Sequence, residues 1–173
     1  NEIAALGVSQ LPGGHAIFPN LSVKENIAAS RWLNASSERN LKGTKQNPLE
    51  IFPEIAERLD EPAANLSGGQ QRRVALARAI MLDPACILYD EPTTGLDPIR
   101  AKAITETIIA IQNTRPRTSV VVTHDLPAAF RLADRMVLLH EGQVRLDASP
   151  EHFLTTDDPI VRAFLDAVPP HQD

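Results

Sequence analysis

A serine and two glycines stand directly before a predicted helix in the stretch Leu66-Ser67-Gly68-Gly69-Gln70. The start of a helix carries partial positive charge and backbone N–H groups that lack intrahelical partners, so it attracts anions. Two glycines let an anion approach the backbone closely, and the Ser67 hydroxyl adds a donor. The stretch therefore predicts a cradle for a terminal phosphate. A plain helix cap made by Ser67 and Gln70 is the alternative.

Two adjacent carboxylates, Asp90 and Glu91, follow the apolar run 86–89. In open α/β sheets, ligands bind at the carboxyl ends of the strands. Neighbouring residues on an extended chain point in different directions. One carboxylate can therefore hold Mg²⁺, directly or through water, while the other orients an attacking water. The alternative is a solvated turn at Asp-Glu-Pro.

A histidine follows a second apolar run, since His124 comes directly after 119–123. Carboxyl ends of parallel strands meet at one edge of a sheet, so Glu91 and His124 are predicted to share a site. A single histidine in this place is commonly just a surface group, which is the alternative. Gly95-Leu96-Asp97 lies between the two runs.

The elements that must position these residues alternate between apolar runs and helical patterns, which predicts an α/β fold with a mostly parallel sheet. Strands are expected at 86–89, 119–123, 136–140 and 143–146. The last two flank Glu141-Gly142 and indicate an antiparallel hairpin. Helices are expected after the capping residues Ser67, Ser149 and Asp158, the last two of which precede prolines, and in a segment that opens near Pro98. The polar segment 30–48 is expected to be a loop or an irregular helical insert.

Leu66 to Gln70, Asp90-Glu91, Gly95 to Asp97 and His124, in this order and at these separations, resemble the ABC ATPase family over nearly the whole chain. The resemblance implies a P-loop NTPase-type, mostly parallel sheet with flanking helices and an inserted helical subdomain. It places that subdomain at about 26–66, a core at 67–148 and a helical tail at 149–173.

The resemblance also implies a role for each residue. Ser67, Gly68, Gly69 and Gln70 belong to the signature motif and bind nucleotide. Asp90 ends the Walker B strand and holds Mg²⁺ through water, and Glu91 is the catalytic base. Asp97 belongs to the D-loop and lies at the nucleotide. His124 contacts the γ-phosphate and completes catalysis.

One family motif departs from its usual form. Residues 17–26, Ile17-Phe18-Pro19 onward, resemble the segment that follows the family's Q-loop. Counting back, the usual glutamine falls at Gly13, which has no side chain to coordinate Mg²⁺. Gln10 lies three residues earlier and would serve as a metal ligand only if the loop is rearranged. Branched-chain amino-acid importers of the family have a similar Pro-x-Gly pattern here.

The phosphate-binding pattern Gly-x-x-x-x-Gly-Lys-[Ser/Thr] does not occur in the 173 residues. In the family this Walker A motif precedes the Q-loop. Because the sequence also starts with Asn1, we expect an N-terminally truncated ATPase domain. Residues 1–173 alone should then hydrolyse no ATP and bind it weakly or not at all.

The resemblance implies an ATP-hydrolysing subunit of an ABC transporter, with ATP and Mg²⁺ as cofactors. It implies a head-to-tail dimer with a second ATPase subunit and contact of about 26–66 with transmembrane permease subunits. Such a protein lies at the cytoplasmic face of the inner or cell membrane. For the cargo, 126–167 is similar to ATPases of the Mla/Mce phospholipid-trafficking systems, and 49–58 resembles branched-chain amino-acid importers. We expect a phospholipid, with a branched-chain amino acid as the alternative.

Composition and motif spacing limit the other possible partners and functions of the protein. The net charge of −5 argues against a nucleic-acid partner, and a single cysteine excludes an internal disulfide. Two rival functions stay open: a non-transport ABC ATPase, such as an SMC-like protein or a translation factor, and a catalytically degenerate regulatory module. SMC-like chains insert a long coiled coil where only about 50 residues separate Gly13 from Leu66. The presence of Asp90, Glu91 and His124 argues against the degenerate module.

Overall fold

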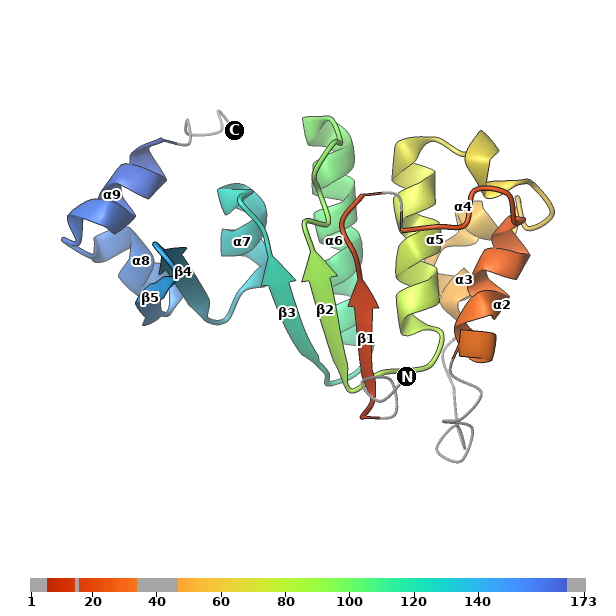
Figure 1. The fold of residues 1–173 in the computed structure, drawn as a ribbon, viewed down its shortest axis with the longest axis horizontal. Coiled ribbons are helices and arrows are strands. Elements are labelled where there is room, and N and C mark those ends of the chain that lie inside the picture. Colours follow the sequence, from red (N-terminus) through yellow and green to blue (C-terminus); the bar gives the residue numbers. More distant parts are fainter. Residues whose placement is uncertain (1–5, 15, 34–46, 168–173) are drawn as a thin grey trace. The chain divides into compact units, whose positions relative to one another are not determined.

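The computed structural model describes residues 6–14, 16–33 and 47–167. These residues form two compact units, within Asn1–Thr123 and within His124–Asp173, and each is described by itself. Figure 1 shows the order of their elements along the chain. The functional division predicted at 66/67 and 148/149 stays a prediction.

The first unit is built on a parallel sheet with the strand order β1-β2-β3. Its strands are β1 (Val8–Leu11), β2 (Cys86–Asp90) and β3 (Thr118–Val122). Asp90 of β2 is in register with Val122 of β3. The carboxyl ends of both strands therefore lie at one edge of the sheet, which confirms the predicted α/β class.

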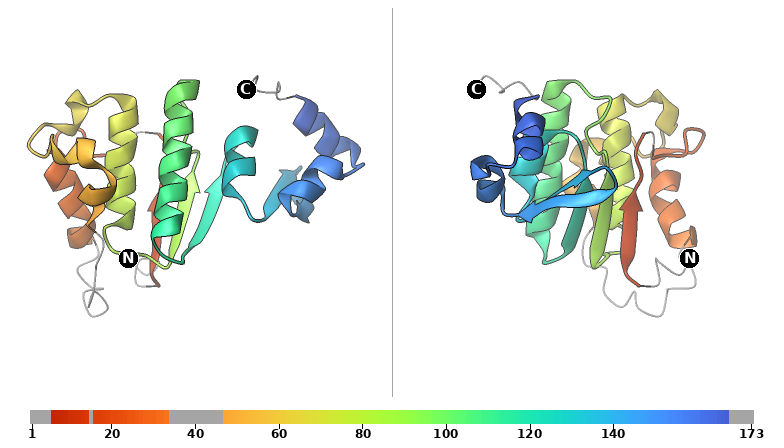
Figure 2. Two further views of the ribbon diagram at one scale, coloured as in Figure 1. Left: turned by 180° about the vertical axis from the view of Figure 1, so that it is seen from behind. Right: turned by 60° about the vertical axis from the view of Figure 1, so that its left-hand side comes forward.

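Two helices, α5 (Gly68–Ile80) and α6 (Pro98–Thr114), cover one face of this sheet, as Figures 1 and 2 show. Ile87 and Tyr89 alternate along β2, so their side chains lie on one face of the sheet, and both are almost fully buried. The helices also bury apolar residues at helical spacing, including Val74, Leu76, Ile80, Ile104, Ile108 and Ile111. The predicted helix starts after Ser67 and near Pro98 are confirmed.

A helical region precedes α5. It contains α2 (Val23–Leu33), α3 (Pro48–Ile51), α4 (Pro53–Ala56) and the 3-10 helix η2 (Ala63–Asn65). Helices α2, α3 and α4 pack against α5. Asn26 is fully buried in α2 and exchanges two hydrogen bonds with the backbone of Phe18, 2.7 Å to its N–H and 2.8 Å to its carbonyl. These bonds fix the segment that enters α2.

The second unit joins α7 (Leu126–Leu132), β4 (Met136–His140), β5 (Gln143–Ala148), α8 (Pro150–Thr155) and α9 (Pro159–Asp166). Strands β4 and β5 form the predicted antiparallel hairpin. Glu141 and Gly142 both have positive φ, 50° and 76°, as a two-residue turn of this kind requires. Met136, Phe153 and Val161 form its core.

The strands expected from the sequence need correction. Strand β1 was not predicted, because four residues that include the polar Ser9 and Gln10 give no apolar run. Residues 30–33 are helical, in line with the helical alternative expected for 30–48, since the buried pattern of α2 continues through Ser30; residues 34–46 lie outside the described ones. Strand β3 runs 118–122, one residue earlier than expected. Among the described residues, no helix combines the length and apolarity that crossing a bilayer needs.

Candidate functional site

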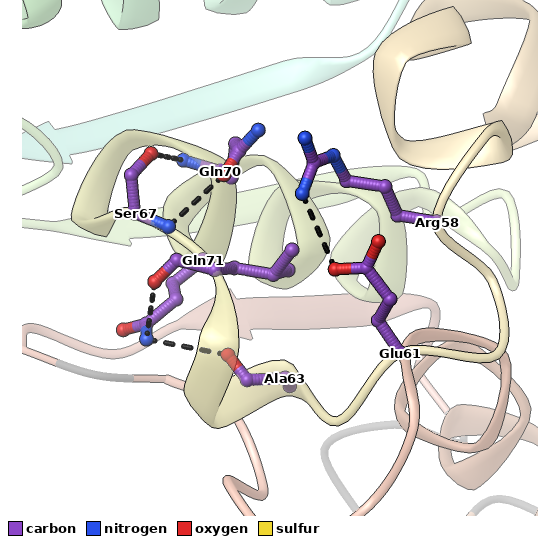
Figure 3. A network of polar contacts seen from close by, with 7 residues as sticks. Arg58, Glu61, Ala63, Ser67, Gln70 and Gln71 are labelled. Carbon is purple, nitrogen blue, oxygen red and sulfur yellow. Dashed lines mark hydrogen bonds and ion pairs between the residues drawn. The ribbon is translucent and has the colours of Figure 1, made fainter.

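The start of α5 is held by a reciprocal cap between Ser67 and Gln70. Gln70 N–H donates to Ser67 Oγ over 3.4 Å, and Ser67 N–H donates to Gln70 Oε1 over 2.9 Å (Figure 3). The capping box predicted from the sequence is thus present. Ser67 is exposed, so the cap leaves its hydroxyl at the surface.

A second set of bonds fixes the chain that leads into this cap. Gln71 Nε2 donates to the carbonyl oxygens of Leu66, at 3.0 Å, and Ala63, at 3.3 Å. Figure 3 shows Gln71 reaching back from α5 to Ala63, the first residue of η2. The side chain of Leu66 is buried and anchors the same turn. These hydrogen bonds and the buried Leu66 support the backbone between Ala63 and Gln71.

No close contact within the chain requires glycine at positions 68 and 69. A β-carbon on Gly68 would stand 3.8 Å from Leu96 Cδ2, and one on Gly69 would stand 3.7 Å from Arg100 Cδ. Both are ordinary van der Waals distances. Neither glycine has positive φ, and glycine costs up to about 1 kcal/mol relative to alanine in a helix. The same distances place Gly68 and Gly69 beside Leu96 and Arg100, next to the predicted D-loop.

The acidic pair lies at the carboxyl end of β2, as predicted. Asp90 is the last residue of the strand, and Glu91 N–H donates to Val122 O of β3 over 2.8 Å. Glu91 has φ +46°, in the left-handed region that non-glycine residues seldom adopt. Such backbone strain is concentrated at functional sites. Thr94 Oγ1 donates to Glu91 Oε2 over 2.8 Å, a contact that the sequence did not reveal.

Gly13 lies next to this strand end, while Gln10 does not. A β-carbon on Gly13 would stand 3.7 Å from Asp90 Oδ2. Gln10 lies within β1, in register with Leu88, two residues before Asp90. The role of Gln10 as a metal ligand stays a prediction. Gly13 is the position whose β-carbon would lie next to the Asp90 side chain.

The predicted D-loop residue Asp97 caps α6. Asp97 Oδ1 accepts from Arg100 N–H over 3.0 Å, and Asp97 Oδ2 lies 3.2 Å from Arg100 Nε. Gly95 has φ +78°, which allows the tight turn before this cap. Both contacts of Asp97 are structural. Its predicted place at the nucleotide stays a prediction, although its exposed side chain is compatible with it.

His124 is exposed and begins the second unit, two residues after the last residue of β3. The neighbouring Asp125 caps α7, its Oδ1 accepting from Ala128 N–H over 3.1 Å. This cap fixes the backbone just after His124. A site shared by His124 and Glu91 stays a prediction.

Asp90 and Glu91 provide the donor chemistry for a magnesium ion. Mg²⁺ is held by one or two carboxylates, with phosphate oxygens and water completing its coordination. Among the described residues, no group of three or more His, Cys, Asp or Glu is arranged to hold a metal. The two carboxylates at the strand end match the number that Mg²⁺ takes when phosphate oxygens complete its coordination.

A pocket of about 410 Å³ lies beside β1 in the first unit. Arg78 of α5 forms part of its wall. Its guanidinium donates to Ala16 O over 2.7 Å and lies 4.6 Å from the centre of the Phe18 ring. Burial lowers the pKa of Arg78. The wall also includes Gln10, Leu11, Ile17, Ser30 and Ala75.

Comparison with known proteins places these features in a family. The family described as "ABC transporter" matches residues 3–94. The glycine betaine uptake ATP-binding protein YehX of Escherichia coli is 36% identical over 95% of this chain and 56% of its own length. The glycine betaine/carnitine/choline transport protein OpuCA of Bacillus subtilis is 36% identical over 80% of this chain and 36% of its own. The phosphate import protein PstB of Pyrobaculum aerophilum is 36% identical over 80% of this chain and 59% of its own length.

The fold has a close counterpart among solved structures. The ADP conformation of MJ1267, an ATP-binding cassette of an ABC transporter, superposes with a TM-score of 0.75 over 96% of this chain and 71% of that one, at 21% identity. The expected P-loop NTPase-type fold is thereby confirmed. The chain spans between 36% and 59% of the three relatives' lengths. The family match covers more than half of the chain, which therefore belongs to the ABC transporter family.

Proposed function

We propose that the complete protein binds and hydrolyses ATP with Mg²⁺ and powers transport through a membrane partner. The observation that carries this proposal is the pair Gly68 and Gly69. The chain's own packing leaves room for a β-carbon at both positions, so packing within the chain does not require glycine there. A phosphate group that approaches the capped start of α5 would require it, because such a group needs close access to backbone N–H groups.

Asp90 and Glu91 have different proposed roles at the end of β2. Asp90 would hold Mg²⁺, directly or through water, and the ion would neutralise charge on the phosphates. Glu91 accepts a proton from the attacking water. Its backbone is tied to β3 through Val122, which keeps the carboxylate at the edge of the sheet where the phosphate lies. A positioned base of this kind contributes a factor of roughly 10²–10⁴.

His124 and the signature residues would complete the site in a dimer. We propose that Ser67, Gly68, Gly69 and Gln70 bind the nucleotide held by a second ATPase subunit, with the two subunits head to tail. His124 then contacts the γ-phosphate, and Asp97 lies at the same interface. Closing the dimer excludes water, which strengthens each polar contact in the site. Residues 1–173 alone lack the Walker A pattern, so we expect no hydrolysis by them.

The permease partner is proposed to contact the helical region at about 26–66, with the protein at the cytoplasmic face of the membrane. Relatives named for phosphate import and glycine betaine uptake support an importer. Their cargoes differ in charge, so no cargo is assigned. The expectation of a phospholipid gains no support from these relatives and is withdrawn.

The test is ATP turnover by the complete protein with Glu91→Gln. This change keeps the size of the side chain and removes the base. We expect turnover to fall by at least about 100-fold while ATP still binds and holds the protein as a dimer. Glu106→Gln, an exposed glutamate in the middle of α6, is the matched control and should leave turnover unchanged. Near-normal turnover of Glu91→Gln would contradict the role of Glu91.

A further inference from the structure

We infer that Thr94 is a positioning residue for Glu91, and that Arg72 of α5 holds the backbone of Thr94 in place. The inference deepens the proposed function, because it rests on Glu91 as the base. It is carried by a chain of hydrogen bonds that runs from the helix of the signature motif to the carboxylate at the end of β2.

The first link joins Thr94 to Glu91 through two bonds. Thr94 N–H donates to the Glu91 carbonyl over 3.3 Å, and Thr94 Oγ1 donates to Glu91 Oε2 over 2.8 Å. The backbone bond closes a turn, and Glu91 occupies the left-handed region within it. The hydroxyl then draws the carboxylate back over the same turn. A carboxylate offers about four lone-pair sites, so one hydroxyl fixes its direction without using up its capacity to accept from water.

The second link joins Arg72 to Thr94. Arg72 has only 6% of its surface exposed, and its Nη2 donates to Thr94 O over 3.4 Å. Burial lowers the pKa of Arg72. Its Nη1 has no hydrogen-bond partner among the residues that the structure describes. Burying a cation in this way is costly, so an apolar side chain would pack at this place in α5 with less penalty. The hydrogen bond to Thr94 O provides a structural role for an arginine at this position.

The two links together connect α5 to Glu91. The helix whose start carries Ser67, Gly68 and Gly69 also carries Arg72, one turn further on. The direction of the Glu91 carboxylate thus depends on a residue of the signature helix in the same chain. A merely structural Thr94 would close its turn through the backbone alone, and loss of its hydroxyl would affect stability and not the chemical step.

The test compares Thr94→Val, Thr94→Ser and Thr107→Val in the complete protein. Thr94→Val removes the hydroxyl at nearly constant shape, and Thr94→Ser keeps it. Thr107→Val is the matched control, because it removes a comparable hydroxyl bond, 2.7 Å to Ala103 O within α6. We expect Thr94→Val to lower kcat by about 3- to 10-fold, the size of one hydrogen bond, with KM for ATP and the melting temperature nearly unchanged. Thr94→Ser should restore kcat to within about twofold of the wild type.

The Arg72 link is tested by Arg72→Met alone and combined with Thr94→Val. If Arg72 acts through Thr94, the double variant should lose little more kcat than the worse single variant. Equal kcat for wild type and Thr94→Val, a higher kcat for Thr94→Val, or no rescue by Thr94→Ser would overturn the inference while leaving the proposed function in place. If the wild type hydrolyses no ATP or Glu91→Gln is active, the proposed function and this inference both fail.

Discussion

Gly13 lies against the carboxylate of Asp90. A β-carbon on Gly13 would stand 3.7 Å from Asp90 Oδ2 and 3.5 Å from the Asp90 carbonyl oxygen. These distances are ordinary van der Waals contacts, and Gly13 does not have positive φ. A β-carbon therefore fits there without strain. The position is the one where a metal bound to Asp90 would be within reach of an added donor.

The first prediction follows from this contact. Gly13→Gln should add an amide oxygen near Mg²⁺ and lower the Mg²⁺ concentration for half-maximal ATP turnover of the complete protein by about threefold or more. Gly13→Ala is the control, because it fills the same space without a donor, and it should leave the Mg²⁺ requirement unchanged. A titration with Mg²⁺ at fixed ATP measures both. Identical requirements for the two variants would show that the position does not reach the metal.

The second prediction separates stability from activity at Gly68. Gly68→Ala should leave the melting temperature unchanged or raise it, because alanine favours a helix and its β-carbon clears Leu96. The expected gain in the free energy of unfolding is at most about 1 kcal/mol. Turnover should nevertheless fall at least about 10-fold, since the added methyl group blocks the approach of a phosphate. Thermal melts and steady-state turnover on the same samples provide the measurement.

Gly142 offers the matched control for that prediction. It has φ +76° in the hairpin turn, so Gly142→Ala should lower the melting temperature and spare turnover. The two alanine variants thus have opposite signatures. If Gly68→Ala loses stability and keeps activity, its glycine serves the fold and the phosphate cradle is wrong.

Local rules account for what the sequence predicted well. The cap of α5 needs only Ser67 and Gln70, three residues apart, and the start of α6 needs only a proline at the first helical position. The hairpin turn needs only Glu141-Gly142 between two apolar runs. In each case the interacting groups are neighbours in sequence, so their residue types determine the geometry.

Contacts between distant residues account for what the sequence did not reveal. Strand β1 is too short and polar to predict, and its pairing with β2 is what brings Gly13 to Asp90. Arg72 and Thr94 are 22 positions apart, and their bond exists only because α5 packs beside the loop after β2. Thr94 itself was within reach of sequence reasoning, as a hydroxyl three residues after a proposed base.

The third prediction concerns the single tyrosine of the chain, Tyr89. Burial raises its pKa from 10.0 to about 12, while the charge of Arg117 acts in the opposite direction. The phenol should therefore ionise near pH 12 in the folded protein and near pH 10 in urea. The difference in absorbance at the phenolate band between wild type and Tyr89→Phe isolates this group during the titration.

The raised pKa of Tyr89 also sets the sign of its effect on stability. Its neutral form is favoured by the fold, so this contribution is complete below about pH 10 and is lost as the pH rises through about 12. Tyr89→Phe should consequently lose less stability than the wild type between these two pH values. Equal loss in both proteins would mean that Tyr89 ionises without resistance from the fold.

The last prediction concerns the proposed head-to-tail dimer. Subunits with Ser67→Arg have a damaged signature and an intact base, and subunits with Glu91→Gln have the reverse. If each site combines the signature of one subunit with the base of the other, a mixed dimer contains one fully intact site and one doubly damaged site. Each variant alone should be inactive. Random mixing of equal amounts should restore about a quarter of wild-type turnover, because half of the dimers are mixed and half of their sites are intact.

The control for that experiment mixes Ser67→Arg subunits with subunits that carry both changes. No arrangement of these chains unites an intact signature with an intact base, so no activity should return. Mixing precedes the addition of ATP, since Glu91→Gln dimers are expected to stay closed once ATP binds. A single-turnover measurement detects hydrolysis at one intact site, even if continuous turnover needs two active sites. Absence of a single turnover in the first mixture would mean that Ser67 and Glu91 serve a site within one subunit, since only sites built from two chains are restored by mixing.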